Sequence, residues 1–143
     1  MNKRQLGKTD INLTAIGFGG APLGNLFENL DERNCYDILE KSYQKGINIY
    51  DTSPLYGYGL SEHRLGNFLK TVDEDSYFLS TKVGRYLTPA NKDNIDRGRF
   101  AGSLNFSPNL DYSYDGVMRA FEQSLLRLAC LLYTSDAADE SRG

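Results

Sequence analysis

The sequence predicts an α/β protein built as a (β/α)8 TIM barrel, of which this chain holds roughly the first three β/α units behind an N-terminal hairpin. Short apolar stretches alternate with segments of helical period, an order that builds a parallel sheet with right-handed crossovers. Gly19, Asp51 and Lys82 follow three successive apolar stretches, and barrels carry their chemistry at the carboxyl ends of their strands. A full barrel takes about 250 residues, so 143 residues form only part of one.

The N-terminal segment predicts a hairpin followed by the first barrel strand. Residues 4–14 place two strand-like pieces around a turn at residues 7–10. Residues 14–19 are a short apolar stretch running into glycines, as expected of a buried strand that ends in a loop. A doubly wound nucleotide-binding sheet would need G-x-G-x-x-G at the start of a helix. Residues 17–22 read GFGGAP, with proline in the third glycine position, and therefore favour the barrel.

Two segments of helical period follow, separated by the second predicted strand at residues 47–51. Asp31 is the predicted cap of the first helix, and Gly46 is its predicted end. The predicted core-facing side of this helix contains Cys35, Ile38, Leu39, Ser42 and Tyr43. Ser61 is the predicted cap of a second helix over residues 62–70.

The third predicted strand, residues 77–82, leads into a stretch without a steady period. Residues 83–112 are rich in Asn, Asp, Gly and Pro and are predicted to form a long loop. Loops longer than about 15 residues are often functional. This one either covers a substrate or is a surface insertion, and it carries Arg97, Arg99 and Phe100. After Ser113 the helical period returns, and the predicted face contains Val117, Ala120, Phe121, Ser124, Leu125 and Leu128.

The composition is that of an ordinary soluble globular protein, with 40% apolar and 24% charged residues and a net charge of -3. Acidic and basic side chains are interspersed, which leaves no footprint for nucleic acid or for an anionic membrane surface. No apolar run reaches the ~20 residues that span a bilayer, so we expect a cytoplasmic protein. Cys35 and Cys130 lie far apart without metal-ligand spacing, so neither a zinc site nor a disulfide is predicted. The expected partner is a small molecule.

Three side chains are predicted to meet at the carboxyl ends of the strands. Asp51 ends the second strand, Lys82 ends the third, and Tyr56 lies in the loop after Asp51. A tyrosine ordinarily exchanges its proton poorly at neutral pH, but a nearby ammonium favours the phenolate. Lys82 would supply that charge, and Asp51 would balance and orient it. On spacing alone the alternative stays open that these polar residues simply meet solvent where the strands end.

Four stretches of the sequence carry a family resemblance. DTSPLYGYGLSEHRLG at residues 51–66 is preceded by GFGGAPLGN at 17–25 and followed by LSTKVG at 79–84 and YSYDGVMRAFEQSLLRL at 112–128. Over roughly residues 4–129 the chain resembles the aldo-keto reductases, most of all the L-fucose or D-threo-aldose 1-dehydrogenase branch. The resemblance implies a (β/α)8 barrel oxidoreductase that transfers hydride between NAD(P)H and an aldose, a small aldehyde or an alcohol.

The resemblance also implies roles for individual residues. Tyr56 would be the general acid or base, Lys82 its activating lysine, and Asp51 the partner of that lysine at the place where the family holds the nicotinamide ribose. The loop that touches the nicotinamide end of the cofactor, NADP or NAD, matches Gly19, Gly20 and Ala21. Many relatives carry Thr at the position of Gly20, so one hydroxyl contact is expected to be lost. No metal ion is implied.

One catalytic residue of the family has no counterpart in this chain. The family usually has a His just after its fourth strand. The single histidine here, His63, lies in the second predicted helix between Glu62 and Arg64, where a solvated surface position is expected. A cofactor-sensing regulatory or binding subunit of the same fold is therefore the alternative to an enzyme.

The last residues of the chain differ in character from the rest. Residues 130–143 read CLLYTSDAADESRG, which resembles the translated end of a transposon-based sequencing adapter. We therefore expect native protein at residues 1–129 and a foreign tail at residues 130–143. The alternative is a fourth strand over residues 130–134 followed by a polar tail. A barrel cut before its fourth strand keeps an unpaired edge, so we expect the chain alone to fold poorly and to be inactive.

Overall fold

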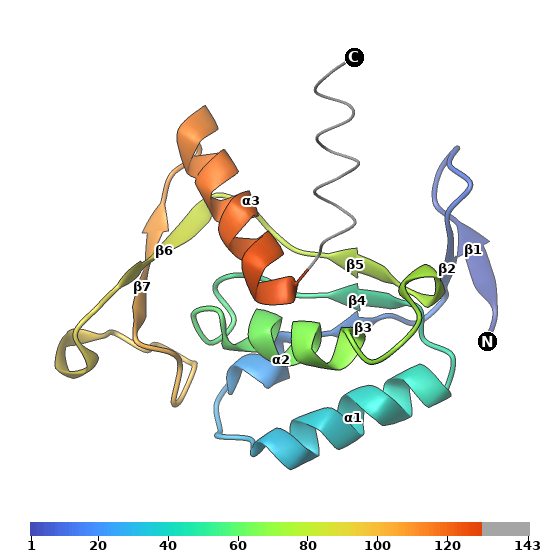
Figure 1. Ribbon diagram of the computed structural model, residues 1–143, viewed down its shortest axis with the longest axis horizontal. Helices are drawn as coiled ribbons and strands as arrows, with labels where there is room; N and C mark the ends of the chain where they lie inside the picture. Colours follow the sequence, from blue (N-terminus) through green and yellow to red (C-terminus); the bar gives the residue numbers. More distant parts are fainter. Residues whose placement is uncertain (130–143) are drawn as a thin grey trace.

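The protein is organised around a short parallel sheet. The computed structural model describes residues 1–129 (Figure 1), and the tail predicted at residues 130–143 lies outside them. The strands β3 (Phe18–Gly19), β4 (Ile49–Asp51) and β5 (Phe78–Ser80) pair in parallel in the order β3-β4-β5. Each strand lies within its predicted stretch and is shorter than predicted. The predicted alternation of parallel strands and helices is confirmed.

A two-stranded ribbon precedes the sheet. β1 (Lys3–Gln5) pairs antiparallel with β2 (Asn12–Thr14), which confirms the predicted hairpin. Thr14 belongs to this ribbon and not to the first barrel strand. Its amide donates to Oδ1 of Asn48 at 2.7 Å, and Nδ2 of Asn48 donates to the Asn12 carbonyl at 2.9 Å. These bonds tie the ribbon to the residue just before β4.

The helix α1 (Glu32–Gln44) begins at its predicted cap, and α3 (Tyr114–Leu128) begins where the predicted helical period returns. The side chains of Asp31 and Ser113 each accept a hydrogen bond from a backbone amide of the first turn, at 2.8 and 3.1 Å. These bonds satisfy amides that have no partner within the helix. Gly46 follows α1 with a φ of +85°, in the left-handed region that commonly ends helices.

The helix α2 (Leu60–Leu69) begins earlier than predicted, because Gly59 is its cap, with a φ of +96° and no side-chain cap bond. The prediction that Ser61 caps this helix is therefore wrong. The Ser61 hydroxyl instead donates to the Gly20 carbonyl at 2.7 Å and lies 2.8 Å from the Thr52 hydroxyl. A serine near a helix start has the same local sequence signature whether it bonds to its own helix or to a neighbouring strand end.

The buried faces of the helices follow the predicted period with one exception. In α3 every member of the predicted face is buried or half-buried, with Ala120, Ser124 and Leu128 the most enclosed. In α1, Cys35 and Leu39 are 1% exposed, whereas Ile38 is 44% exposed. Ile38 lies at the edge of the helical stripe that the neighbouring elements cover, so the period placed it inside incorrectly.

The predicted loop over residues 83–112 is in fact a β-hairpin. β6 (Arg85–Pro89) pairs antiparallel with β7 (Phe106–Leu110). Each strand contains a proline and several polar residues. These residue types have low strand propensity, so the sequence predicts a loop where the structure has two strands. A tertiary contact stabilises the hairpin, because the side-chain amide of Gln123 in α3 bonds to both the amide and the carbonyl of Leu87, each at 2.9 Å.

The helices α1 and α2 lie on a different side of the sheet from the β6–β7 hairpin. In Figure 1, α1 and α2 lie on one side of the strands, and the β6–β7 hairpin lies beyond their carboxyl ends. The hydrophobic core between the sheet and the helices consists of Leu23, Cys35, Leu39, Tyr50, Leu65, Phe68, Leu69 and Leu128. Short 3-10 helices cover Ala21–Gly24, Glu74–Ser76 and Lys92–Asn94. Among residues 1–129, none of the helices is long and apolar enough to cross a membrane.

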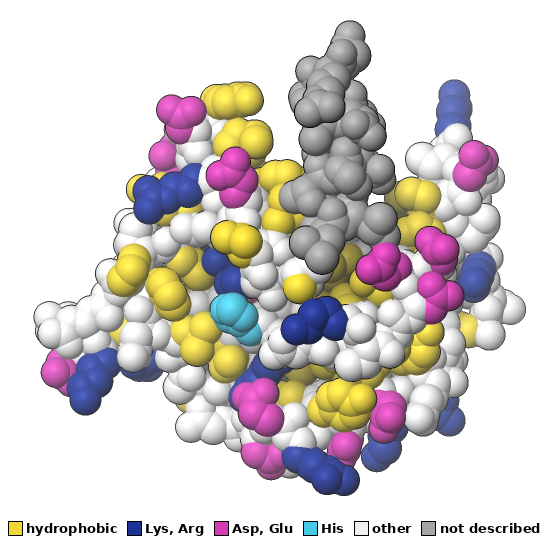
Figure 2. All heavy atoms as spheres, viewed as in Figure 1, with side chains coloured by type: hydrophobic (Ala, Val, Ile, Leu, Met, Phe, Trp, Pro, Cys, Tyr) yellow, Lys and Arg dark blue, Asp and Glu magenta, His cyan; other side chains and the backbone are white. Residues whose placement is uncertain are grey.

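Apolar side chains also gather on the surface. Figure 2 shows hydrophobic side chains in yellow over α3 and the β6–β7 hairpin, on the left of the view. The most exposed of them, between 63 and 83% exposed, are Leu110, Tyr112, Tyr114 and Leu126. This surface is formed by β7, the link after it and α3, all of which follow β5 along the chain.

Candidate active site

The three parallel strands bring their ends into line at one edge of the sheet. Gly19 pairs with Asp51, and Asp51 pairs with Ser80, in the register of the two ladders. The pairing continues one residue further on each side, because the Gly20 amide donates to the Asp51 carbonyl at 2.7 Å and the Thr52 amide donates to the Ser80 carbonyl at 2.8 Å. The loops that leave the strands therefore start from fixed positions.

Asp51 and Lys82 form an ion pair at this edge. Nζ of Lys82 donates to Oδ2 of Asp51 at 2.7 Å and to the Thr52 carbonyl at 2.8 Å. The other carboxylate oxygen of Asp51 accepts from the Ser80 hydroxyl at 2.9 Å. Both charged side chains are about half-exposed, at 47% and 44%, so the pair lies at the surface of a site that solvent or a ligand can reach.

The charge of Lys82 is held in place by its neighbours. Burial lowers the pKa of the Lys82 ammonium, but the hydrogen bond and charge of Asp51, together with Tyr56, outweigh it and raise the pKa above its ordinary value of 10.5. Lys82 is therefore an ammonium throughout the neutral range. Its Nζ lies 5.1 Å from the centroid of the Tyr56 ring, so the structure brings the three predicted side chains together.

The backbone around Tyr56 is fixed by two glycines that approach each other closely. A β-carbon on Gly24 would lie 2.4 Å from the carbonyl carbon of Tyr56, and one on Gly57 would lie 2.6 Å from the Gly24 carbonyl oxygen. Gly57 also has a φ of +68°, which favours glycine. Gly59 is approached in turn by the Arg127 side chain, whose Cδ would lie 2.9 Å from an added β-carbon. The glycines of this loop thus make room for protein atoms.

The predicted cofactor loop presents one open residue and one enclosed residue. Gly19 is exposed, and a β-carbon there would meet nothing within 4 Å. Gly20 is buried, and a β-carbon there would lie 2.9 Å from both the Asp51 carbonyl oxygen and the Ser61 hydroxyl. Ala21 is half-buried at the start of the first 3-10 helix. The Ser61 hydroxyl occupies the space that a side chain at position 20 would need. The hydroxyl group next to the Gly20 backbone therefore belongs to a serine of α2.

Glu62 is a buried acid beside the exposed His63. It is 0% exposed, and its carboxylate accepts a hydrogen bond from the Thr81 hydroxyl at 2.7 Å and pairs with the Arg127 guanidinium. The surface position expected for His63 is confirmed, since it lies on the exposed side of α2. Partial burial and the Arg127 charge lower the pKa of the His63 imidazole.

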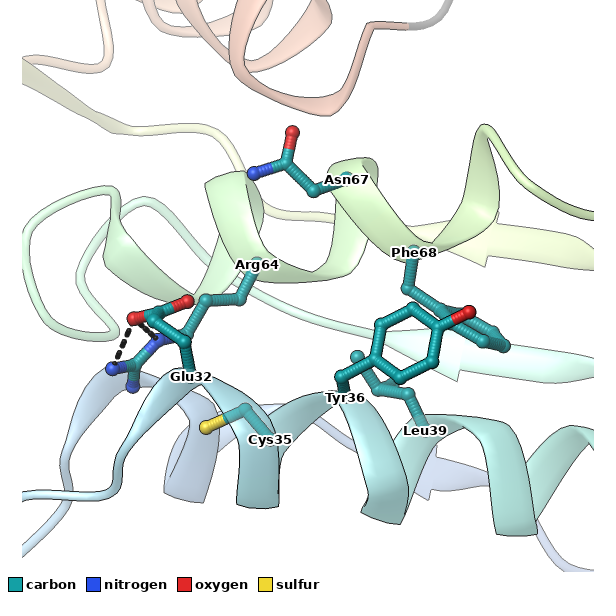
Figure 3. A pocket seen from close by; sticks show the side chains of 7 residues that line it. All are labelled: Glu32, Cys35, Tyr36, Leu39, Arg64, Asn67 and Phe68. Atoms are coloured by element: carbon teal, nitrogen blue, oxygen red, sulfur yellow. Dashed lines mark hydrogen bonds and ion pairs between the residues drawn. The ribbon is translucent and has the colours of Figure 1, made fainter.

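Arg64 is likewise buried, at 8% exposed. Figure 3 shows its guanidinium beside Glu32, at the end of a pocket of about 180 Å³ between α1 and α2. Nη2 lies 2.6 Å from Oε1 of Glu32, and the guanidinium also donates to the carbonyls of Leu23 and Leu30 at 2.9 and 2.8 Å. Its donors bind the segment that connects β3 to α1, so this pocket is separate from the strand-end site.

The donor set at the strand ends suits proton transfer and not metal binding. Within residues 1–129, no group of three or more His, Cys, Asp or Glu side chains is placed to hold a metal ion. The groups that do converge are a phenol, an ammonium and a carboxylate. A phenol beside an ammonium and a carboxylate provides the kinds of group that general acid and base chemistry uses.

Known proteins are similar to this chain in sequence and in structure. The chain is 43% identical over 148 residues to pyridoxal 4-dehydrogenase of Microbacterium luteolum, covering 94% of this chain and 43% of the relative. It is 48% identical over 77 residues to a D-threo-aldose 1-dehydrogenase of Pseudomonas sp, covering 54% of this chain and 23% of the relative. The chain therefore spans less than half the length of these relatives.

The fold agrees with this similarity. The holo form of an aldo-keto reductase from Bacillus halodurans superposes with a TM-score of 0.68 and 31% identity, covering 90% of this chain and 37% of that one. Such structural neighbours are (β/α)8 barrels, of which this chain forms a part. The sequence profile described as "Aldo/keto reductase family" matches residues 15–132. With most of its length matched and its strands and helices superposing on members, the chain belongs to the aldo/keto reductase family of oxidoreductases.

Proposed function

We propose that this chain is the tyrosine-bearing part of an NAD(P)-dependent oxidoreductase that transfers hydride between a nicotinamide cofactor and the carbonyl carbon of an aldose or a small aldehyde. One observation carries the proposal. The Lys82 ammonium lies 2.7 Å from the Asp51 carboxylate and 5.1 Å from the centroid of the Tyr56 ring. A phenol, an ammonium and a carboxylate in that order form a proton donor that works near neutral pH.

Each of the three residues has one task in the proposed reaction. In the reducing direction the Tyr56 hydroxyl donates its proton to the carbonyl oxygen of the substrate, and in the oxidising direction the phenolate takes a proton from the alcohol. Lys82 stabilises the negative charge that the phenol oxygen carries between these two states. Asp51 balances the lysine charge and fixes the direction of the ammonium.

The residues around Gly19 fit a nicotinamide cofactor, NADP or NAD. Gly19 is an open position without a side chain, and the Asp51 carboxylate, its partner in the ladder, is half-exposed beside it. A flat surface next to a carboxylate suits a ribose whose hydroxyls donate hydrogen bonds. Ala21 would border the same surface. The chemistry that the cofactor supplies when bound is the donation or acceptance of hydride.

The proposed substrate class follows the chemistry of the site and the names of the relatives. One relative is named a pyridoxal 4-dehydrogenase and another a D-threo-aldose 1-dehydrogenase. Both names describe the dehydrogenation of a small molecule, pyridoxal in one case and an aldose in the other. A single phenol donor beside an open cofactor surface is suited to this type of substrate. We therefore propose a small carbonyl compound or sugar as the partner of this protein.

The test starts at the gene, because residues 130–143 are proposed to be foreign to the protein. Sequencing the source DNA across codons 120–143 is expected to show a frame that continues beyond residue 129 into an apolar strand ending in His. If the DNA encodes CLLYTSDAADESRG and then stops, the catalytic proposal fails for this chain, and a regulatory or binding role replaces it.

The full-length product of that gene is then assayed by nicotinamide absorbance with aldoses and small aldehydes. Tyr56→Phe removes only the proton donor and is expected to lower kcat by a factor of about 100 or more while cofactor affinity stays within about twofold. Tyr36→Phe is the matched control, because Tyr36 is 44% exposed and lines the separate pocket between α1 and α2. Equal loss in both variants, or full activity in Tyr56→Phe, would contradict the proposal.

A further inference from the structure

The loop between β6 and β7 is bound to two other loops at the edge of the candidate site. We call residues 96–104 the rim loop. Phe100 forms a β-bridge with Leu26, and the Phe27 amide donates to the Arg99 carbonyl at 2.7 Å. On the other side, the Leu104 amide donates to the carbonyl of Gly57, the residue after Tyr56, at 3.0 Å. The rim loop is therefore connected to the loops that follow both β3 and β4.

The rim loop is also held together internally. The Arg97 guanidinium donates to the carbonyl and hydroxyl of Ser103 and, at 3.0 Å, to Oδ1 of Asn105. Gly102 has a φ of +61°, and a β-carbon there would lie 2.4 Å from Oδ1 of Asn29. In a surface insertion without a role, we would not expect an arginine that binds carbonyls of its own loop, or a glycine that packs against a distant loop. Arg97 therefore maintains the loop and does not reach for a ligand.

Backbone strain is concentrated where these loops meet. Among residues 1–129, four non-glycine residues have a positive φ, and three of them lie on the joined loops: Asn25 at 63°, Phe27 at 67° and Tyr58 at 54°. Such a conformation is unfavourable for a bulky side chain and persists only where surrounding contacts hold it. Phe27 donates to the rim loop, and the Tyr58 hydroxyl donates to the Asp96 carbonyl. Two of the strained residues, Phe27 and Tyr58, are thus held by contacts with the rim loop.

The side chain that joins the rim loop to the reacting group is Phe100. Its ring centroid lies 6.0 Å from that of Tyr56 with an interplanar angle of 38°, and 6.4 Å from that of Tyr58 with an angle of 59°. Both distances lie within the range of favourable aromatic pairs. The Lys82 ammonium lies 5.1 Å from the Tyr56 ring centroid. Tyr56 thus has a cation and an aromatic ring as neighbours, and its ring orientation depends on both.

We propose that the rim loop is the outer wall of the active site and that Phe100 is a positioning residue, which holds the Tyr56 ring in its orientation relative to Lys82. The inference rests on the proposed function, because it assigns a residue that acts through the proposed proton donor. It also decides between the two readings of residues 83–112 that the sequence leaves open, in favour of a wall over the substrate. The aromatic contact is what transmits the loop position to the phenol.

Variants of the full-length protein test the role of Phe100. Phe100→Ala is expected to lower kcat by a factor of about 10 to 100, since a small misplacement of a reacting group has effects of this size. The pH profile of kcat is expected to shift as well, while the KM for the cofactor stays unchanged. Phe100→Tyr keeps the ring and is expected to restore kcat to within about threefold. Phe100→Leu repeats the comparison with more retained volume if Phe100→Ala does not fold.

The matched control is Tyr86→Ala, which removes an aromatic ring from the same hairpin. The Tyr86 ring packs under the Arg119 guanidinium at 4.2 Å and lies on β6. This variant is expected to keep kcat and its pH profile. If Phe100→Ala behaves like Tyr86→Ala while Tyr56→Phe is inactive, the inference is wrong and the proposed function stands. If the unmodified protein shows no turnover that depends on Tyr56, the proposed function fails and the positioning role fails with it.

Native-state cleavage by trypsin adds a readout that needs no turnover. The rim loop contains Arg97 and Arg99, both potential cleavage sites. Because both neighbouring loops bind the rim loop, the unmodified protein and Tyr86→Ala are expected to resist cleavage there, and Phe100→Ala is expected to be cut at least several-fold faster. Rapid cleavage at these two sites in the unmodified protein would show a loose insertion and overturn the inference.

Discussion

Lys82 connects the groups of the candidate site. Its ammonium bonds to the Asp51 carboxylate and to the Thr52 carbonyl, and it lies over the Tyr56 ring. The carboxylate and the carbonyl come from consecutive residues at the end of β4, so one strand end fixes two of the three contacts. The position of the ammonium is therefore set mainly by backbone pairing, which is more rigid than side-chain packing at a half-exposed site.

The pH dependence of stability is expected to show the raised pKa of Lys82. Since the pKa is higher in the folded protein than in the unfolded chain, the Asp51–Lys82 pair stabilises fully below pH 10.5 and loses this effect as the pH rises through the raised value. Urea unfolding of the full-length protein and of Lys82→Met between pH 7 and about pH 11.5 measures it. The difference between the two proteins is expected to be constant at first and to shrink above pH 10.5. A difference that shrinks between pH 7 and 9 would contradict this.

The close approach of two loop backbones makes a second prediction at the scale of one residue. Gly24→Ala would place a β-carbon 2.4 Å from the Tyr56 carbonyl carbon, and such overpacking against backbone typically costs about 1–3 kcal/mol. Gly19→Ala is the control for stability, because a β-carbon there meets nothing within 4 Å. Thermal unfolding of both variants is the measurement. Equal stability of the two would show that the loop can move aside.

At the scale of elements, one buried ion pair joins α2, α3 and the end of β5. Glu62 in α2 pairs with Arg127 in α3 and accepts from the Thr81 hydroxyl just after β5. The side chains are 0% and 11% exposed. Beside them, Gly66 lets the helices approach so closely that an added β-carbon would lie 2.8 Å from Cα of Leu128. A glycine and a satisfied charge pair together set the position of α3 against α2.

Breaking this pair from one side is expected to destabilise the full-length protein strongly. Glu62→Ala would leave the Arg127 guanidinium buried without its counter-charge, a change that typically costs about 3–5 kcal/mol. Asp37→Ala is the control, because Asp37 and Arg33 form an exposed pair at 3.8 Å within α1. That variant is expected to change stability by less than about 0.5 kcal/mol. Denaturant unfolding measures both, and similar losses in the two variants would contradict a special role for the buried pair.

At the scale of the whole molecule, residues 1–129 form an apolar groove of about 590 Å³. It is lined by the N-terminal ribbon, by β5 and by α3, and its apolar walls include Leu13, Ile49, Leu79, Phe121, Leu125 and Leu128. Within residues 1–129 the sheet order is β3-β4-β5, so β5 is an edge strand beside this groove. An apolar groove next to an unpaired edge favours association with another strand or chain.

The 143-residue chain expressed alone is therefore expected to associate and to lack a cooperative thermal transition. Within residues 1–129 no further strand pairs with β5, and an exposed strand edge favours association with other chains. Size-exclusion chromatography with light scattering, followed by calorimetry, measures both properties. The full-length protein, in which further barrel strands are proposed to cover the groove, is the control. A soluble monomer of the short chain with a sharp transition would contradict this prediction.

Several features follow from the sequence alone because they depend on short-range rules. The cap at Asp31, the end at Gly46 and the start of the helical period after Ser113 are local patterns, and each is where the sequence predicts it. The alternation of elements follows from the hydrophobic period, and the family that the four quoted stretches resemble agrees with the matched family. The same rules place Asp51 and Lys82 at neighbouring strand ends, since parallel strands end at the same edge. Their catalytic roles stay predictions that the proposed variants test.

Other features were decided only by the tertiary structure, because their partners lie far away in the chain. Glu62 and Arg127 are 65 residues apart, and Ser61 and Gly20 are 41 residues apart, so no local pattern shows that these polar groups are buried and satisfied. The strands β6 and β7 form where propensity predicts a loop, since the Gln123 side chain of α3 bonds to the backbone of β6. Local sequence determines where an element can begin and end, whereas contacts between distant segments determine which side chains become buried and which backbone groups pair.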